Sequence, residues 1–422
     1  MRNSFLLLIA TCLSSSLSMA QQHRTCATHD LYIQEIKADP TILTRRASME
    51  QQIQRWISSN TVQRSQGGSQ TIITIPVVVH VLWYNANQDI TDAQILSQID
   101  VLNQDYGLLN PDTTLVPAAF KPLVANVQFQ FCMATTDPNG NPTNGIERRQ
   151  TTISRIGNGN RYYQTSQGGL NIWNPNSYLN FWICDIDGGS TLGYTYLPGT
   201  VNASKDGVVI DWQYWGTIGT VSPPFNKGRT ATHEVGHWFN LEHIWADEPN
   251  CSMDDYVSDT PQQKGENYGC PNYPQTTQSG GRCSNSDPSA MYMNYMDYTD
   301  DACMFMFTPG QAARMQASLN LSRPGLFNSL GCNSPSGISN ASQSGRCIVH
   351  PNPTNGEFEI EARGWGAPVQ VAIVDVSGRI VRSEQFAAGD RIRIDLSSES
   401  SGIYHIRLSA NDRQQFAKVI KY

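Results

Sequence analysis

Three histidines crowd into the segment "ATHEVGHWFNLEHIW", although the whole chain has only eight. His233 and His237 are four residues apart, so on a helix both imidazoles stand on one face and can reach one cation. His243 follows six residues after His237, and the chain must turn between them. Asn240 suits that turn, because Asn is second only to Gly in adopting the left-handed conformation that ends a helix. Three neutral imidazoles are typical of a zinc site that keeps one coordination position for chemistry.

A carboxylate stands next to the first of these histidines. Glu234 is rotated toward the same side of the helix, where it can hold a water molecule against the metal and take its proton. Zinc lowers the pKa of a bound water to about 7 and polarises carbonyl groups, so the pattern predicts hydrolysis of a carbonyl substrate. Glu242, one residue before His243, is expected to support the ligands or to face solvent. A structural zinc would normally recruit cysteine thiolates, and none lies in the segment.

The first twenty residues read as a secretion signal. Arg2 supplies a positive charge, an apolar run follows, and Ser18-Met19-Ala20 forms a cleavage site. A lipid anchor on Cys12 is an alternative, which Thr11 before it fits poorly. No later run is long enough for a membrane span. The formal net charge of −7 argues against nucleic acid or an anionic membrane as the main partner.

The rest of the chain divides into four segments that differ in polarity and in hydrophobic pattern. Residues 21–68 are polar, with a helical pattern over 42–57, and are too thin to fold alone. From 69 to 331, strands alternate with helices capped by Thr91 and Thr308, which predicts an α/β domain; within it, residues 249–296 should be irregular. Residues 332–346 read as a linker, and short alternating strands over 347–422 predict a small β-sandwich. The strands expected in the α/β domain start at residue 71 and lie at 127–134, 179–185, 192–197 and 208–212.

Export makes the cysteines a source of disulfides. Ten are present, and nine remain once Cys12 leaves with the signal. Nine is odd, so one thiol must stay free, pair between molecules or have another role.

The histidine segment resembles a motif of a known protein family. His233-Glu234-x-x-His237-x-x-Asn240-x-x-His243 resembles the extended zinc motif of the metzincin endopeptidases, with Asn where that family usually has Gly. Downstream, "MNYMDYTDDACM" resembles the metzincin Met-turn, with Met296 as the apolar floor beneath the metal. With the cysteine-rich insert, residues 71–330 resemble the pappalysin branch. The resemblance implies a metzincin fold, with a twisted mixed sheet, an active-site helix and an irregular C-terminal subdomain. It also implies that Tyr298 approaches the zinc and supports the oxyanion.

The same resemblance implies how a peptide substrate binds. The strand around "TLGYTYLPG" matches the upper rim of the cleft, where an extended peptide adds as an antiparallel strand. Leu192 and Gly193 are the expected contributors. Related bacterial members favour arginine on the primed side of the scissile bond, and Asp301, among the acids Asp297, Asp300 and Asp301, could supply the negative charge. A loop carboxylate is otherwise most often solvated.

The odd cysteine suggests a zymogen. Cys26 is the first cysteine after the signal, and a thiolate is a good zinc ligand. If residues 21–68 are a propeptide that lies across the cleft, Cys26 could occupy the zinc and keep the enzyme inert, which resembles the cysteine switch of some metzincin zymogens. The alternative is an unpaired cysteine in a discarded leader. Cleavage is expected between Arg55 and Gly68, with Arg55 and Arg64 as attractive sites.

Eight cysteines then remain for pairing. The order in the family implies the pairs Cys251–Cys283 and Cys270–Cys303. Elimination leaves Cys132–Cys184 and Cys332–Cys347.

The stretch "CSMDDYVSDTP" gathers oxygen ligands in an irregular loop: Asp254, Asp255, Asp259 and Thr260. Such hard donors suit calcium, although this is no EF-hand. Composition alone leaves an ion site and a solvated acidic turn equally open, and the pappalysin resemblance implies a structural calcium.

The last domain resembles the C-terminal sorting domain of the type IX secretion system. The matching features are "PNPTNG" from Pro351, the "DVSGRIV" turn and "SGIYHIRL". By its strand pattern alone, a carbohydrate- or protein-binding module is equally possible. The resemblance implies the secretion machinery as a partner and a location at the cell surface or in the medium.

Taken together, these features predict a secreted zinc endopeptidase that acts on protein or peptide substrates. Two alternatives remain. One is a surface binding protein with a vestigial zinc site, which the intact Glu234 argues against. The other is a zinc amidase that acts on a non-protein substrate.

Overall fold

A computed structural model of the chain describes residues 23–64, 72–248, 251–277, 280–332, 347–362, 368–375, 379–387, 391–410 and 413–422. The signal expected over residues 1–20 lies outside this part. The chain forms two compact units that divide between Pro335 and Ser336, within the predicted linker. In the described part, every helix is too short or too polar to cross a membrane.

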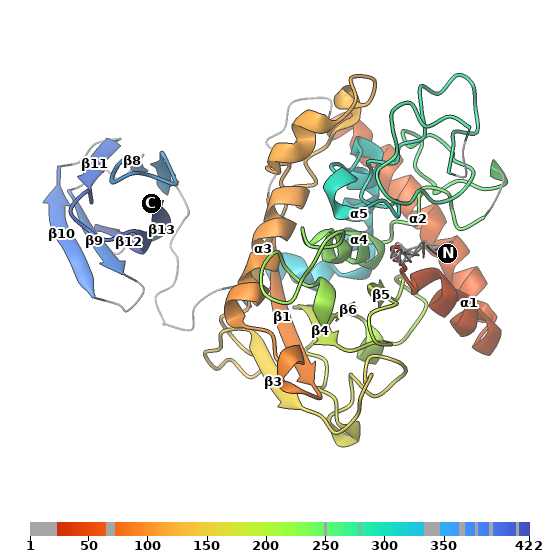
Figure 1. Cartoon of the computed structure of the whole chain (residues 1–422), viewed down its shortest axis with the longest axis horizontal. Helices are drawn as coiled ribbons and strands as arrows, with labels where there is room; N and C mark the ends of the chain where they lie inside the picture. Colours follow the sequence, from red (N-terminus) through yellow and green to blue (C-terminus); the bar gives the residue numbers. More distant parts are fainter. Residues whose placement is uncertain are drawn as a thin grey trace, which may run out of the picture. The chain divides into compact units, whose positions relative to one another are not determined.

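A mixed sheet forms the centre of the first unit (Figure 1). Its strands are β1 (Ile73–Trp83), β2 (Phe129–Met133), β3 (Ile146–Gln150), β4 (Leu179–Cys184), β5 (Gly193–Thr195) and β6 (Val208–Asp211). The order is β2-β1-β4-β6-β5, and β3 pairs with the second half of β1. Neighbours are parallel except β5, which pairs antiparallel with β6 at the edge. The parallel strands β1, β4 and β6 are nearly continuous apolar runs, because both faces of a parallel sheet are covered.

Three helices of this unit hold the sheet and the site. They are α3 (Asp92–Tyr106), α4 (Arg229–Trp238) and α5 (Pro309–Ser322). The Thr91 side chain caps α3, and Thr308 forms a full capping box with Gln311 at the start of α5, as predicted. All ten residues of α4 are buried, so this helix lies inside the molecule rather than on it. Short 3₁₀ helices cover Ala86–Gln88, Pro111–Leu115, Lys121–Leu123, Thr165–Gln167, Ala203–Lys205, Trp212–Tyr214, Asp301–Cys303 and Pro324–Asn328.

The N-terminal segment folds as two helices, α1 (Thr28–Ala38) and α2 (Thr41–Arg64), drawn in red in Figure 1. The sequence predicts the second helix and misses the first, whose apolar residues are few. Helix α2 packs against α5 and buries Ile42 and Ile53 completely. A segment too polar to fold alone therefore takes its core from the unit it covers.

The second unit is a small all-antiparallel β-sandwich. One sheet has the order β10-β9-β12-β13 and the other β11-β8-β7. Alternate residues of the strands point into one apolar core, which includes Ile360, Ile373, Ile394, Ile406 and Leu408. The strands are β7 (Cys347–His350), β8 (Glu357–Ala362), β9 (Val369–Asp375), β10 (Ile380–Phe386), β11 (Arg391–Asp395), β12 (Gly402–Ala410) and β13 (Arg413–Lys421).

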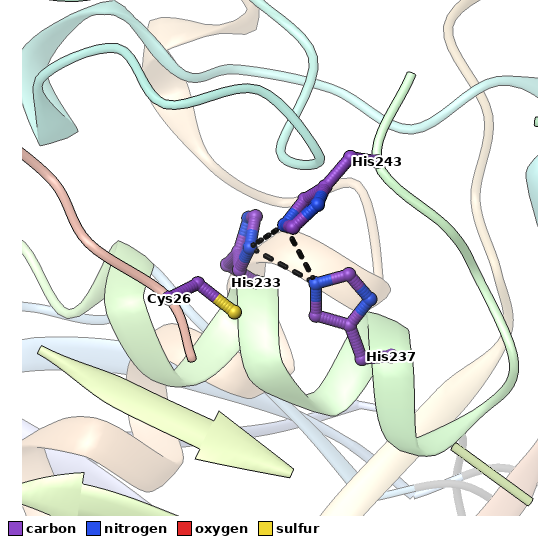
Figure 2. A group of neighbouring side chains, drawn as sticks. All are labelled: Cys26, His233, His237 and His243. Atoms are coloured by element: carbon purple, nitrogen blue, oxygen red, sulfur yellow. Dashed lines mark hydrogen bonds between the residues drawn. The ribbon is translucent and has the colours of Figure 1, made fainter. Parts of the chain in front are cut away.

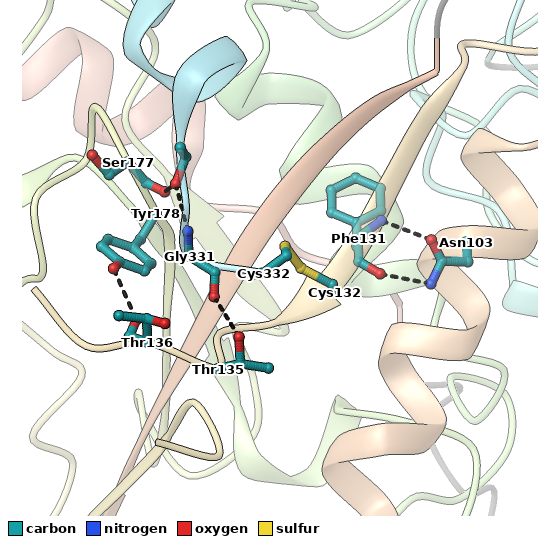
Figure 3. Close-up of a disulfide and its surroundings, with 10 residues drawn as sticks. Asn103, Phe131, Cys132, Thr135, Thr136, Ser177, Tyr178, Gly331 and Cys332 are labelled. Atoms are coloured by element: carbon teal, nitrogen blue, oxygen red, sulfur yellow. Dashed lines mark hydrogen bonds between the residues drawn. A yellow bond between two sulfur atoms is a disulfide. The ribbon is translucent and has the colours of Figure 1, made fainter. Parts of the chain in front are cut away.

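The disulfides correct half of the predicted pairing. Cys251–Cys283 and Cys270–Cys303 form as predicted. The predicted pairs Cys132–Cys184 and Cys332–Cys347 are wrong, because Cys132 bonds Cys332, 200 residues away. Figure 3 shows that this bond ties β2 to the segment after α5, where Thr135 donates its N–H to Gly331 O at 2.7 Å. Cys184 is a buried thiol at the end of β4, and the Cys347 side chain lies outside the described part.

Candidate metal centre and cleft

Helix α4 and the turn after it bring the three predicted zinc ligands together. His233 and His237 stand on one face of α4, and Asn240 has φ 72°, the left-handed conformation expected of it. The chain then reverses and carries His243 back over the helix (Figure 2). Each Nε2 atom lies 3.0–3.2 Å from the other two.

The other ring nitrogens fix the protonation of these imidazoles. Nδ1 of His233 donates to Tyr295 O at 2.7 Å, Nδ1 of His237 donates to Leu241 O at 2.8 Å, and Nδ1 of His243 donates to Asp247 Oδ1 at 2.6 Å. All three partners only accept, so each ring carries its proton on Nδ1 and presents a lone pair on Nε2.

Three lone pairs that converge in this way repel one another unless a cation lies between them. Burial keeps the imidazoles of His233 and His237 neutral, since it lowers the pKa of His233 well below its usual value and that of His237 to about 3. Neutral, converging imidazole nitrogens are the donors that zinc prefers, and the residues present therefore fit this metal.

The predicted Met-turn lies directly beneath α4. Met296 is fully buried, and a Cβ on Gly236 would lie 2.5 Å from its sulfur, so a glycine here lets the turn approach the helix. Asp297 anchors the turn by accepting bonds from Gln263 Nε2 and from both nitrogens of Asn267, at 2.8–2.9 Å. The carboxylate of Asp297 therefore stabilises the turn by these hydrogen bonds, and burial raises its pKa to about 6.

The N-terminal segment enters the cleft and brings Cys26 to the histidines. Its sulfur and the three imidazole nitrogens lie within 4.8 Å of one another, and this is the one such cluster in the described residues. Burial raises the pKa of the Cys26 thiol in the absence of a metal. A zinc ion at the histidines would reverse that preference, because thiolate is the form that binds zinc.

Leu192 and Gly193 hold this segment by its backbone. Leu192 N donates to Thr25 O at 2.9 Å, and Ala27 N donates to Gly193 O at 3.2 Å. Cys26 pairs with Gly193 in the parallel sense, opposite to the antiparallel sense predicted for a substrate. A side chain at Gly193 would meet Val209 O at 3.0 Å and the Glu234 stem at 3.1 Å, so glycine lets the chain pass close to the carboxylate.

Glu234 and Tyr298 both contact the N-terminal segment at or near Cys26. Glu234 is buried, which raises its pKa to about 7, and its Oε2 accepts a bond from Thr28 Oγ1 at 3.1 Å. Thr28 Oγ1 in turn accepts from Thr195 N of β5 at 3.0 Å. The Tyr298 hydroxyl donates to the main-chain oxygen of Cys26 at 3.2 Å, and its ring lies 4.9 Å from that of His243.

The guanidinium group of Arg24 is buried in an acidic pocket beside the start of α4, where Asp301 supplies the negative charge. Arg24 is 2% exposed, and its Nη2 donates to Asp301 Oδ1 at 2.5 Å, while Nε donates to Thr299 O and Nη1 to Thr230 Oγ1, both at 3.2 Å. The guanidinium also lies 5.1 Å from the Phe225 ring centre. Asp301 is held by the N–H groups of residues 227 and 229. It is therefore a buried, oriented carboxylate rather than a solvated one.

The carboxylates of the three predicted calcium-binding aspartates do not form a cluster with one another. The Asp255 carboxylate accepts from Val257 N and Thr260 Oγ1, and burial raises its pKa. Asp259 accepts from Thr308 Oγ1 and Gly310 N at the start of α5, and Asp254 caps Tyr256 N. These side chains already have protein donors, so calcium binding by this loop stays a prediction.

From the sequence, no role was assigned to Arg24, Thr28 or Asp247. Asp247 stands four residues after His243 and orients it, an arrangement that carboxylates often have behind metal-binding histidines. His29 also approaches Asp247, at 3.2 Å. The four-residue spacing was a usable signal, whereas the partners of Thr28 and Arg24 lie about 200 or more positions away.

Comparison with known proteins agrees with this geometry. Residues 164–320 match the family described as pregnancy-associated plasma protein-A, and residues 348–422 match the secretion system C-terminal sorting domain. An extracellular metalloprotease of Arthroderma benhamiae is 32% identical over 256 residues, 60% of this chain and 80% of that protein.

Two solved structures from Tannerella forsythia are also similar. A promirolysin mutant is 40% identical, with a TM-score of 0.64 over 74% of this chain and 98% of its own. Mature mirolysin in complex with a cleaved peptide is 44% identical, with a TM-score of 0.57 over 63% of this chain and 97% of its own.

The Asp247 contact predicts an effect on metal binding. Replacing Asp247 with Ala removes the acceptor that orients His243, and zinc affinity should fall about 10–100-fold. Competition with a chromogenic chelator measures this in the protein from residue 72 onward. Glu248→Ala, one residue on and exposed, is the matched control. Equal zinc affinity in the two variants would contradict a positioning role for Asp247.

Proposed function

We propose, for a chain that belongs to the pregnancy-associated plasma protein-A family of zinc metalloendopeptidases, that it is made as a zymogen and cuts peptide bonds with arginine on the primed side. The C-terminal unit is a type IX sorting domain, so the enzyme is secreted. One observation carries the proposal. In the N-terminal segment of residues 21–68, which we call the leader, the run from Arg24 to Thr28 contacts the Asp301 carboxylate, the three histidines and the Glu234 carboxylate in turn.

The residues of the cleft divide the work of hydrolysis. Zinc, when bound by the three histidines, supplies Lewis-acid activation of water and of the scissile carbonyl. Glu234 takes a proton from the attacking water and later donates it to the leaving amine. Its burial supports this role, because a carboxylate with a pKa of about 7 can both accept and return a proton near neutral pH. The Tyr298 hydroxyl already donates to a main-chain carbonyl at this position and would do the same for the substrate's oxyanion.

Arginine preference follows from the contacts of Arg24. A substrate arginine entering the same pocket would meet the Asp301 carboxylate, a carbonyl oxygen, a hydroxyl and an aromatic face. Lysine would forfeit most of these, because its ammonium is a point charge without the planar fork. The upper-rim groups Leu192 N and Gly193 O would hold the substrate backbone once the leader has left.

Latency is explained by the direction of the leader. The leader pairs parallel with β5, whereas the proposed substrate pairs antiparallel, so its peptide bonds meet the catalytic groups in reversed order. The Cys26 sulfur lies beside the three histidine nitrogens, where it would take the position at a bound zinc that water needs. The side chains of the leader therefore occupy the positions of substrate side chains, but its backbone runs in the direction opposite to that of a substrate.

Glu234→Gln should abolish proteolysis by the mature enzyme. Glutamine keeps the size of the side chain but cannot accept the proton, so kcat should fall by about 10²–10⁴ with zinc content unchanged. Hydrolysis of casein and metal analysis measure the two quantities. The exposed Glu248→Gln variant serves as control. A Glu234→Gln enzyme with normal kcat would exclude the residue as general base.

Asp301→Asn should remove the preference for arginine. Loss of one partner of a buried, hydrogen-bonded charge pair typically costs 2–5 kcal/mol, so kcat/KM for a peptide with primed-side arginine should fall at least about thirtyfold. A matched peptide with norleucine there should lose far less. Asp300→Asn, on the neighbouring carboxylate, controls for the general loss of charge. An unchanged ratio of the two peptides in the Asp301 variant would refute this pocket assignment.

A further inference from the structure

Two charged residues of α2 meet two opposite charges of the catalytic unit. Arg46 Nη2 donates to Glu242 Oε1 at 3.0 Å, and Nη1 donates to Pro198 O at 3.3 Å. Glu50, four residues on and thus on the same helical face, accepts a bond from Arg314 Nη1 at 2.8 Å, and its Oε2 lies 2.7 Å from Arg314 Nη2 in an ion pair. Arg46 is largely buried and Arg314 completely so. These pairs are desolvated and geometrically specific.

The same contacts reach the turn that positions the zinc ligands. Arg46 Nη1 also donates to Asn240 Oδ1, and Arg314 Nε donates to Asn240 O at 2.8 Å. The Asn that replaces the usual Gly therefore has a use that Gly could not have, since its side chain accepts a bond from the leader. Around this polar centre, Ile42 and Ile53 of α2 are buried as apolar anchors. Buried arginines are among the residues that most often carry the binding energy of a protein interface.

The leader thus has two separate parts. The run that fills the cleft, Arg24 to Thr28, ends on the first residue of α1, whereas Arg46 and Glu50 lie in α2, beyond the break between the helices. Cutting after α2 would break no contact of either part.

We propose that the surface formed by Pro198, Asn240, Glu242 and Arg314 is a second binding site of the mature enzyme, outside the cleft, whose occupant is the α2 helix of the cleaved leader. Helix α2 supplies affinity and the cleft run supplies inhibition. The released leader consequently stays bound until α2 is itself degraded. This inference rests on the proposed zymogen.

Leader exchange tests the second site independently of catalysis. A Glu234→Gln precursor carries a recognition site for a foreign protease inserted between residues 65 and 71 and is cut there. The rate at which a labelled leader leaves the remainder is then followed by fluorescence and gel filtration. Four leaders are compared: unchanged, Arg24→Ala/Cys26→Ala, that pair combined with Arg46→Ala/Glu50→Ala, and that pair combined with Gln51→Ala/Arg55→Ala. The last is the matched control, since Gln51 and Arg55 have the same spacing on the exposed face of α2.

The leader without its cleft contacts should still co-elute with the enzyme. Adding Arg46→Ala/Glu50→Ala should raise its dissociation rate at least tenfold, and adding the control pair should change it less than twofold. Alanine favours helix, so faster release cannot be ascribed to melting of α2. Complete release of the Arg24→Ala/Cys26→Ala leader, or equal rates for the last two leaders, would overturn the proposal. A failure of the proposed protease activity would leave all these rates unaffected.

Discussion

Three imidazole lone pairs that face one another at 3.0–3.2 Å are the constraint on which the rest of this structure depends. Such an arrangement is unfavourable without a cation, and it persists because three different segments hold the opposite ring nitrogens. The Met-turn supplies Tyr295 O, the turn after α4 supplies Leu241 O, and the following loop supplies the Asp247 carboxylate. The buried helix, the left-handed Asn240 and the glycine above Met296 are all needed to bring these acceptors into place. The fold thus holds the three imidazoles in the arrangement that a metal ion requires.

The leader is built as a complement to that site rather than as a simple plug. Each group that we propose for substrate binding or hydrolysis has a partner in it: the Asp301 carboxylate meets a guanidinium, the three histidines meet a thiol, and the Glu234 carboxylate meets a hydroxyl. These contacts shield charges that would otherwise be buried without partners, which is costly in a protein interior. The second set of charge pairs joins α2 to Glu242 and Arg314, and on our proposal it retains the leader independently of inhibition.

Local spacing was enough to predict that His233, His237 and His243 come together and that the chain turns at Asn240, because a helix converts a four-residue separation into proximity. The caps at Thr91 and Thr308 and the β-sandwich were predictable for the same reason. Contacts across the chain were not. Cys132 finds Cys332 over 200 residues, so elimination among the cysteines failed there, although family order gave the two pairs of the insert. Strand β3 was missed because "IERRQ" lacks alternation and takes its conformation from β1. Composition could not separate carboxylates that bind calcium from carboxylates that cap helices and turns, so it left the role of the acidic loop open.

The most direct test of the account is X-ray absorption at the zinc edge, recorded on the intact precursor and on the enzyme after removal of the leader. We expect one sulfur and three nitrogen neighbours in the precursor, and no sulfur neighbour in the mature form. The Cys26→Ala precursor should lack the sulfur while keeping the nitrogens. A precursor whose zinc has only nitrogen and oxygen neighbours would contradict the central claim that Cys26 closes the histidine site.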